Sequence, residues 1–459
     1  MAQAVVAGRV TQPSVARRLF TLALPVIGLN VLNVLALFVD TAMVGRLPNA
    51  DDALTGLGFA VQLLFLLMVA MLGLTVGTVA QVARAHGAGH AGRVDHILHQ
   101  SVQLTVLLGL SVAVIGNAVA PWLLEVLGAH GDAHAEAVRY LRPLLLGVVF
   151  NYLNILLAAV LRGVGNTKLA FLVALLMNAV NVVLNYGLIL GNLGMPAMGV
   201  QGAAIGTVCA QALAVVVMAW SLRSGVIDGV FLRLRPAMLD LALARDFVRV
   251  GWPAALDMIV LNAGFLSIVG FLGAIDQHAV AAHGIGLRIQ ALAFVPGMSI
   301  SQAAGAMVGN ALGAGSVDEA RRVVRAAGVL CFTVMSSLGL LIWGLDERLL
   351  WIFEVDPAGT IGQASLIWIA QLALCMPPVG LYLAFVGAFQ GSGATRLSLG
   401  INAAATLAIQ IPLSWVLAFP LGLGLLGAWA GFPISIFFKA ALAWFFYQRG
   451  GWAKVGARA

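Results

Sequence analysis

Twelve apolar runs of roughly 20 residues, each long enough to cross a bilayer as a helix, follow one another along this chain. They begin near residues 18, 54, 96, 137, 168, 198, 247, 279, 322, 361, 396 and 424. Only 9% of the 459 residues are charged, whereas an ordinary soluble domain carries roughly 25%. Because no segment remains for a soluble domain, the sequence predicts an all-α polytopic membrane protein with twelve transmembrane helices.

The basic residues indicate how these helices are oriented. Nineteen of the 25 Lys and Arg fall at the termini or in connections from an even-numbered to an odd-numbered helix. The positive-inside rule therefore predicts that both termini are cytoplasmic. Because this topology accounts for the net charge of +7, the charge does not indicate a nucleic-acid partner. We expect a monomer among the lipids of a bacterial inner membrane, with its first helix retained rather than cleaved as a signal peptide.

The chain repeats itself at an offset of 226 to 228 residues, which is half its length. Pro25 aligns with Pro253, and the segment 161–168 aligns with 389–396. The repeat predicts an N-terminal six-helix lobe over 1–222, a cytoplasmic linker over 223–246 and a C-terminal six-helix lobe over 247–459. Two lobes of six helices enter from the same side, so we expect a pseudo-two-fold axis along the membrane normal. Such duplication favours a transporter over a mere packing scaffold.

Several short motifs occur in both halves, namely Leu24–Pro25, Asp40–Arg46, Gly73–Thr78, Ala83–Gly89, Leu161–Thr167, Ala281–Ile285 and Gly305–Gly315. They resemble those of the multidrug and toxic compound extrusion (MATE) transporters. Each piece is weak alone, but their order and duplication cover the whole chain. The resemblance implies an exporter of drug-like, often cationic compounds, which works by alternating access and is driven by inward flow of protons or sodium.

The second half of the chain departs from one branch of that family. The NorM-like branch carries a Glu in its seventh helix and an Asp in its tenth. Here the corresponding segments, Ile259–Asn262 and Gly380–Val386, contain no carboxylate. The sequence therefore looks more like the DinF-like branch, which works from the first lobe.

Asp40 is the leading functional candidate. Of the 18 acidic residues, only Asp40 and Asp257 lie within apolar runs, and an ionisable group at membrane depth is a functional hypothesis by default. Pro25 lies fifteen residues before Asp40 and gives the first helix a natural bending point, because proline removes a backbone hydrogen bond. In the DinF-like pattern the matching Pro and Asp belong to a switching helix.

Polar partners for Asp40 are available in the helix that begins near residue 168. Asn181 and Asn185 are four residues apart and so share one helix face. The resemblance places an Asn, a second Asn or Asp, and a Thr that matches Thr207 at the ion-coupling site. Asn185 stands where some relatives have an acid, which leaves at most a weak sodium site at these four residues. We therefore expect proton coupling, with sodium as the second choice.

Other intramembrane polar residues are secondary cavity candidates. They are Asn33, Asn151, Asn154, Asn178, Asp257 and Arg288. For Asn178 we favour hydrogen bonding between helices, and for Asn151 and Asn154 packing is an equal alternative. Asp257 has no acidic counterpart in the first half, where Leu29 stands. It either pairs with Arg288 or Lys439 or acts as a second protonation site.

Several other kinds of chemistry find no support. No Walker-type loop occurs, so ATP is not the expected energy source, and neither the three scattered cysteines nor the cluster His86, His90, His96 and His99 predicts a metal site. An integral membrane enzyme would need acid, base or metal-ligand residues that converge at one membrane interface, and the duplicated pattern offers none. We expect no cofactor and small-molecule substrates. The nearest alternative is a lipid or lipid-linked oligosaccharide flippase of the same superfamily, which would need a strongly cationic central cavity.

Overall fold

The computed structural model of the chain describes residues 14–227, 230–232 and 238–455, and within that part every regular element is a helix. The first half contains α1 (Val15–Val44), α2 (Ala50–Gly87), α3 (Ala91–Val126), α4 (Gly131–Leu146), α5 (Val148–Gly163), α6 (Thr167–Leu190) and α7 (Val200–Arg223). The second half contains α8 (Leu241–Ile275), α9 (Gln277–Gly313), α10 (Val317–Gly344), α11 (Asp346–Ile352), α12 (Thr360–Gly391), α13 (Thr395–Ala405), η1 (Thr406–Gln410), α14 (Ile411–Ala418), α15 (Gly424–Gln448) and α16 (Gly451–Lys454).

The described helices account for twelve membrane crossings. Eleven continuous stretches are long and apolar enough to cross a bilayer, one of them being the stretch from α13 through η1 to α14. The remaining crossing is made by α4 and α5, which meet at Gly147 and are bent by 57°. The predicted all-α fold is confirmed, and the apolar pattern did not reveal this bend.

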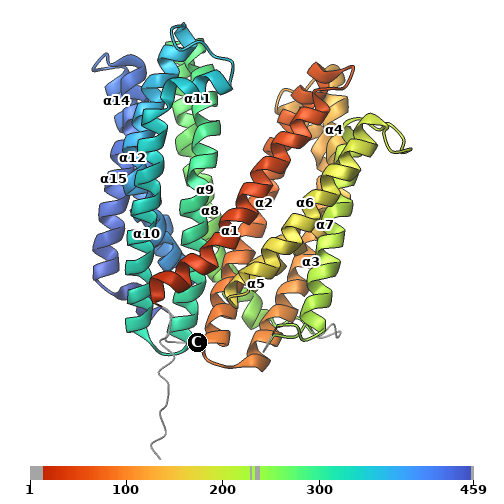
Figure 1. Cartoon of the computed structure of the whole chain (residues 1–459), viewed down its shortest axis with the longest axis vertical. Helices are drawn as coiled ribbons and strands as arrows, with labels where there is room; N and C mark the ends of the chain where they lie inside the picture. Colours follow the sequence, from red (N-terminus) through yellow and green to blue (C-terminus); the bar gives the residue numbers. More distant parts are fainter. Residues whose placement is uncertain (1–13, 228–229, 233–237, 456–459) are drawn as a thin grey trace, which may run out of the picture.

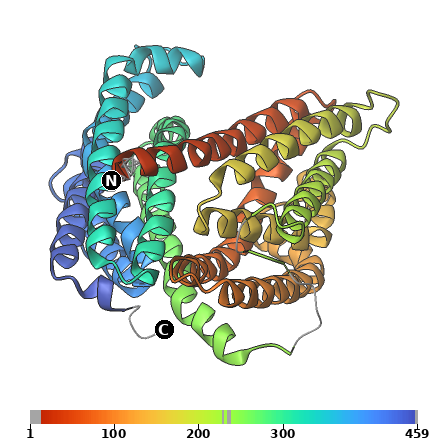
Figure 2. The ribbon, with the colours of Figure 1, turned by 60° about the horizontal axis from the view of Figure 1, so that its bottom comes forward.

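The helices form two lobes that splay apart at one end and meet at the other (Figure 1). The N-lobe contains α1 to α7, and the C-lobe contains α8 to α16. The described part of the chain begins and ends where the lobes meet (Figure 1). The view from below shows α8 along the boundary between the two lobes (Figure 2).

The connection between the lobes is partly described. Helix α7 ends at Arg223 and α8 begins at Leu241, inside the range predicted as linker, while Arg233 and Arg235 lie outside the described residues. The Asp240 carboxylate caps α8 by accepting from Leu243 N and Ala242 N, and it also contacts His96 Nε2 at 3.1 Å. The Leu243 amide and His96 hold the pKa of Asp240 below its usual value, so this cap is ionised at neutral pH.

Helix α1 belongs to both lobes. In its first half, Leu19 and Ala23 are buried in the same apolar cluster as Ile300 of α9. In its second half, Val44 is buried with Ile189 of α6 and Val200 of α7. A single helix of 30 residues therefore connects the core of the C-lobe to that of the N-lobe.

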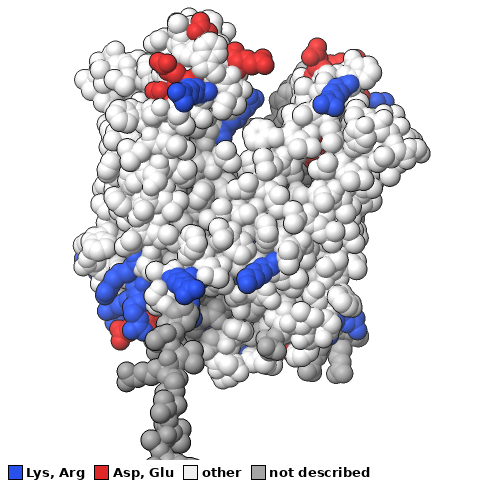
Figure 3. Space-filling model, in the orientation of Figure 1, with Lys and Arg blue, Asp and Glu red and all other residues white. Residues whose placement is uncertain are grey.

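Charged side chains gather at the two ends of the molecule, with a broad uncharged belt between them (Figure 3). Acidic side chains dominate the splayed end, and most of the visible Lys and Arg lie at the closed end. Helix ends in this region include Arg17 and Arg18 of α1 and Arg321, Arg322 and Arg325 of α10. The belt is the surface expected of a protein whose sides face lipid.

Candidate functional site

Asp40 lies near the splayed end of α1, and its side chain faces α6. Asn185 Nδ2 donates to Asp40 Oδ1 at 2.7 Å, a length typical of a hydrogen bond to an ionised acceptor. Asn185 is fully buried, whereas Asp40 is only partly buried. The carboxylate is thus held by one buried amide on a neighbouring helix while it stays partly exposed itself.

A second pair of polar residues lies one turn away on the same face of α6. Asn181 Nδ2 donates to Thr207 Oγ1 at 3.2 Å, and Thr207 Oγ1 donates to the Ala203 carbonyl within α7 at 2.9 Å. All four residues implied by the resemblance therefore gather where α1, α6 and α7 meet. Asp40 bonds Asn185, however, while Asn181 bonds Thr207, so the four side chains form two adjacent pairs.

Asn185 sits against α7 at a point where only glycine fits. A Cβ atom built on Gly206 would overlap the Asn185 Oδ1 atom. That oxygen is buried and accepts no hydrogen bond from any described residue. The nitrogen faces Asp40 because an ionised carboxylate accepts hydrogen bonds and cannot donate one to the amide oxygen, while the close approach of α7 at Gly206 limits the space in which the amide can move.

Tyr140 of α4 also belongs to this site, although the sequence did not single it out. Its phenol lies near enough to Asp40 for the two groups to interact electrostatically, and its ring packs on the cluster around Val44 and Ile189. Helix α4 is the first part of the bent crossing, and it packs on α2, α3 and α7. No local sequence signal places residue 140 beside residue 40.

The secondary candidates do not gather around Asp40. Asn178 Nδ2 donates to the Ala174 carbonyl at 2.8 Å, so the bond is within its own helix rather than between helices as we expected. Asn154 Nδ2 contacts Met177 Sδ at 3.4 Å. Asn151 is partly buried, and Asn33 and Arg288 are exposed. Asp257 lies in the C-lobe with Ser398, apart from the Asp40 site.

Helix α1 is continuous through Pro25, although this residue cannot donate to the carbonyl of Thr21 one turn earlier. Five residues later, Asn30 Nδ2 donates to Ser299 Oγ of α9 at 2.9 Å. This bond ties the first helix to the C-lobe. Pro25 therefore lies where α1 contacts the C-lobe, and Asp40 lies on the part that contacts the N-lobe.

The closed end of the molecule is held by two matching contacts between the lobes, which we call the seal. Arg84 of α2 donates through Nη2 to the Ser392 carbonyl after α12, and Asn310 of α9 donates through Nδ2 to the Gly163 carbonyl of α5. Arg84 and Asn310 occupy equivalent positions in the repeat, as do Gly163 and Gly391, the residue before Ser392. Each lobe thus binds a helix end of the other.

The ends of α2 and α9 cross within the seal at backbone contact. A Cβ on Gly87 would overlap the Asn310 carbonyl, and a Cβ on Gly313, its repeat equivalent, would overlap that of Arg84. His86 Nδ1 lies 2.8 Å from Asn310 Oδ1. His96 instead contacts Asp240, so these two histidines of the cluster have separate partners.

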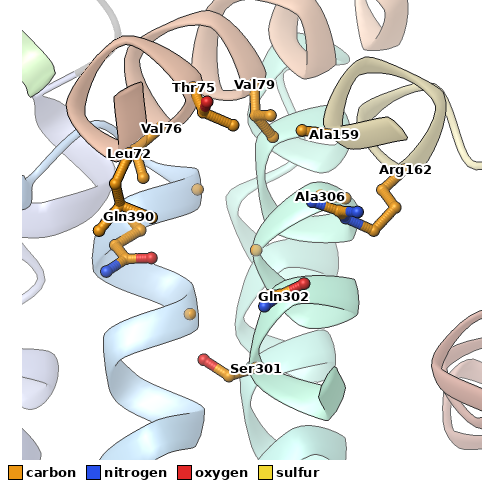
Figure 4. Close-up of a pocket in the computed structure, with 13 residues that line it drawn as sticks. Leu72, Thr75, Val76, Val79, Ala159, Arg162, Ser301, Gln302, Ala306 and Gln390 are labelled. Atoms are coloured by element: carbon orange, nitrogen blue, oxygen red, sulfur yellow. The ribbon is translucent and has the colours of Figure 1, made fainter. Parts of the chain in front are cut away.

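A cavity of about 610 Å³ of empty space, its open mouth included, lies between the lobes next to the seal. Its walls come from α2, α5, α9 and α12, and Figure 4 shows Arg162 on one side and Gln390 on the other. These two residues are repeat equivalents. Arg162 is the one charged residue in the lining, which otherwise combines Gln302, Gln390, Ser301 and Thr75 with aliphatic side chains.

A duplicated bundle of twelve crossings, splayed at one end and sealed at the other around a cavity, is the architecture of a membrane transporter rather than an enzyme. The family model described as MatE matches residues 25–187 and 253–416. The chain therefore belongs to the MatE family of transporters. The two matched segments begin at the equivalent residues Pro25 and Pro253.

Relatives and solved structures of this family match the chain along almost its entire length. The probable multidrug resistance protein NorM of Thermotoga maritima is 29% identical, with 96% of this chain and 94% of the relative covered. The multidrug resistance protein PmpM of Pseudomonas aeruginosa is 29% identical, with 92% and 88% covered. A solved structure described as the outward-facing conformation of a multidrug resistance MATE family transporter has a TM-score of 0.88 at 23% identity, with 96% of this chain and 97% of that chain covered.

Proposed function

We propose that the protein is a multidrug exporter of the cytoplasmic membrane in which proton influx through Asp40 drives alternating access. The observation that carries the proposal is the course of α1. Its Asp40 is bonded to Asn185 in the N-lobe at 2.7 Å, and its Asn30 is bonded to Ser299 in the C-lobe at 2.9 Å. A change at Asp40 is thereby transmitted to the contact between the lobes.

The coupling step is the loss of charge at Asp40. The ionised carboxylate accepts a charge-assisted hydrogen bond from Asn185, which is roughly twice as strong as a neutral one. A proton arriving from the external side neutralises Asp40 and weakens that bond. Helix α1 then leaves α6, bends at Pro25 and reduces the space in the N-lobe, so that the drug is expelled.

The splayed end faces outward in this proposal, and both termini are cytoplasmic. The support is the accumulation of Lys and Arg at the closed end (Figure 3), which the positive-inside rule assigns to the cytoplasm. The likeness in fold to the structure described as outward-facing agrees with this orientation. The seal then closes the cytoplasmic entrance.

Protons are the proposed coupling ion because the site offers little to a metal cation. Sodium needs several oxygen ligands, but the site directs the Asn185 nitrogen at Asp40 and uses Thr207 Oγ1 as an acceptor from Asn181. Among these four residues, Asp40 supplies the single carboxylate that a cation could bind. This arrangement, with no second acid at residue 185, favours a DinF-like mechanism confined to the N-lobe and driven by protons.

The cavity beside the seal is the proposed position of the drug before release. Its aliphatic walls suit an apolar ring system, and Gln302 and Gln390 offer hydrogen bonds. Arg162 favours a compound that presents a carboxylate to it and disfavours a cation at that wall. A flippase for phosphate-bearing lipids would need several cations there, and Arg162 is the single charge among the lining residues, so the exporter is the better assignment.

The test uses purified protein in liposomes loaded with norfloxacin or ethidium, with proton and sodium gradients imposed separately. We expect a proton gradient to drive transport and a sodium gradient alone to be ineffective. Asp40→Asn should reduce the proton-driven rate at least about tenfold, because the charge-assisted bond to Asn185, which contributes about 1.5–3 kcal/mol, no longer responds to pH.

Asp52→Asn is the matched control, since Asp52 is an exposed acid in the first turn of α2. It should transport like the wild type. A response to sodium alone would overturn the choice of ion. Normal proton-driven transport by Asp40→Asn would show that this residue does not couple transport to protons.

A further inference from the structure

A line of polar side chains runs through the interior of the C-lobe, along the crossing formed by α13, η1 and α14. Its members are Ser398, Asn402, Thr406, Gln410 and Ser414, and each is at most 3% exposed. The spacing of four residues keeps them on one side of the helix. The middle of this crossing is a π turn, Thr406–Gln410, a distortion that occurs frequently at functional sites. We call this set the polar line.

The polar line is hydrogen-bonded to Asp257 of α8. Ser398 Oγ donates to Asp257 Oδ2 at 3.2 Å, and Asn402 Nδ2 donates to the Asp257 carbonyl at 2.9 Å. Thr406 Oγ1 continues the chain by donating to Asn402 Oδ1 at 3.1 Å. Ser398 thus bonds the carboxylate of Asp257 directly, while Asn402 and Thr406 extend the polar side chains from the main chain of Asp257 towards the middle of the crossing.

Lys439 of α15 supplies the opposite charge. It is completely buried, its Nζ lies 6.0 Å from the ring centroid of Tyr382, and its charge interacts with that of Asp257. One turn before it, Ser435 Oγ contacts Gln410 Oε1 at 3.4 Å. The polar line is therefore enclosed by α8 on one side and α15 on the other.

The two charges do not satisfy each other directly. No ion pair within 4.0 Å joins them in the described part of the chain, and Lys439 Nζ, Asp257 Oδ1 and Ser414 Oγ make no hydrogen bond to any described residue. Leaving a buried charged group unsatisfied costs more than the roughly 1–3 kcal/mol of a neutral one. Asp257 Oδ1 is therefore a buried acceptor that can take up a proton without breaking a hydrogen bond to a described residue.

The duplication offers no structural reason for these residues. At the repeat-equivalent positions the N-lobe has Leu29 for Asp257, Ala170 for Ser398 and Ala174 for Asn402. The scaffold therefore folds with apolar side chains at these three places. Thr406 corresponds to the polar Asn178, so what distinguishes the C-lobe is the end of the polar line at Asp257.

We propose that Asp257 and Lys439 form a second proton-binding site, reached through the polar line of the C-lobe. A proton delivered by water binds a carboxylate oxygen of Asp257 and leaves again as the lobes change position, while Lys439 stays an ammonium ion. The described groups facing Asp257 are Lys439 of α15, the Tyr382 phenol of α12 and the uncharged Ser398 and Asn402 of α13. This inference rests on the proposed exporter function. The site adds one proton to each transport cycle.

The number of protons per drug molecule is the measurement that tests this site. In liposomes with no membrane potential, each coupled proton raises the limiting drug gradient tenfold per pH unit. We expect Asp257→Asn to lower that limit about tenfold per pH unit while drug binding is unchanged. Asp276→Asn, at an acid that caps α9 in an external connection, should leave the limit as in the wild type.

Infrared difference spectra between acid and neutral pH test the same site without transport. We expect one protonated-carboxyl band to disappear in Asp257→Asn and also in Lys439→Met, because the exchange needs both charges. If Asp257→Asn does not fold, Asp257→Glu keeps the carboxyl group, and the band should move to the frequency of a Glu side chain.

The outcomes separate this inference from the coupling proposed for Asp40. An unchanged gradient limit and unchanged carboxyl bands in the Asp257 variants would overturn the second site, whatever Asp40→Asn does. A lowered limit in Asp257→Asn, together with normal coupling in Asp40→Asn, would support the second site and overturn the proposal for Asp40.

Discussion

At the scale of residues, the Asp40 site depends on how a single amide is oriented. Asn185 can present either its nitrogen or its oxygen to a neighbour, and only the nitrogen bonds a carboxylate. Gly206 on α7 lies against the Asn185 oxygen, so the amide fits beside Asp40 only because residue 206 has no side chain.

A methyl group at residue 206 should therefore disturb the site without removing any of its polar groups. We expect Gly206→Ala to displace the Asn185 amide and to slow proton-driven transport by about tenfold, since the lost bond to a charged group contributes about 1.5–3 kcal/mol. The measurement is the rate of drug efflux in liposomes. Gly58→Ala on α2, where a Cβ meets nothing within 4 Å, should keep the wild-type rate. Equal rates for both variants would contradict this role for Gly206.

The sequence predicted some of these residues better than others. Asp40 could be found because a charge in an apolar run is conspicuous, and Asn181 and Asn185 because helical spacing places them on one face. Tyr140 and Gly206 could not be found in this way, since an aromatic residue and a glycine are ordinary in a membrane helix. Their importance comes from contacts between segments about 100 and 20 residues apart in the chain, respectively.

At the scale of elements, α1 is the part that connects the site to the rest of the protein. Leu19 and Ala23 are buried in the C-lobe, whereas Val44 is buried in the N-lobe. Pro25 lies near the point where the helix passes from one lobe to the other. The missing bond to the Thr21 carbonyl makes this the place where α1 bends with least cost.

Replacing that proline should stiffen α1. Alanine provides an N–H for the Thr21 carbonyl and is about 3 kcal/mol more favourable than proline inside a helix. We expect Pro25→Ala to raise the melting temperature and to reduce the transport rate several-fold, with drug binding retained. Fluorescence titration and efflux assays separate the two effects. Pro121→Ala on α3, another proline inside a helix, should change the stability without slowing transport, and wild-type transport by Pro25→Ala would contradict a hinge at this residue.

At the scale of the whole molecule, the duplication creates the seal. Because the two halves repeat, the ends of α2 and α9 meet as equivalents, with Gly87 beneath the Asn310 backbone and Gly313 beneath that of Arg84. Arg84 and Asn310 then each reach a carbonyl of the other lobe. The seal combines close-packed glycines with two side-chain donors, Arg84 and Asn310, that bond backbone carbonyls, so it can separate and reform without breaking an ion pair.

A methyl group in the seal should force the lobes apart at the closed end. We expect Gly313→Ala to separate α2 from α9 by on the order of 1–2 Å, because the new carbon and the Arg84 carbonyl need ordinary contact distance, and to lower transport several-fold. Spin labels at Ala91 and Val317, in a chain without its three cysteines, would report longer distances. Gly328→Ala on α10, where nothing lies within 4 Å, should leave the distance distribution unchanged. A distribution for Gly313→Ala equal to that of the wild type would show that the seal tolerates a side chain.

The lengths of the apolar runs, the internal repeat and the rare charges can be read along the chain, and they predicted the all-α fold, its two similar halves, and Asp40 and Asp257 as the acids within the apolar runs. The packing of the helices set three further features: Asn185 and not Asn181 donates to Asp40, α1 contacts both lobes, and Asp257 joins a polar line near Lys439. The role of Arg84 and Asn310 in the seal also follows from this packing, because the repeat shows only that the two positions are equivalent. These outcomes depend on which helix faces which and on fractions of an ångström at glycine contacts, and no periodicity along the chain encodes them.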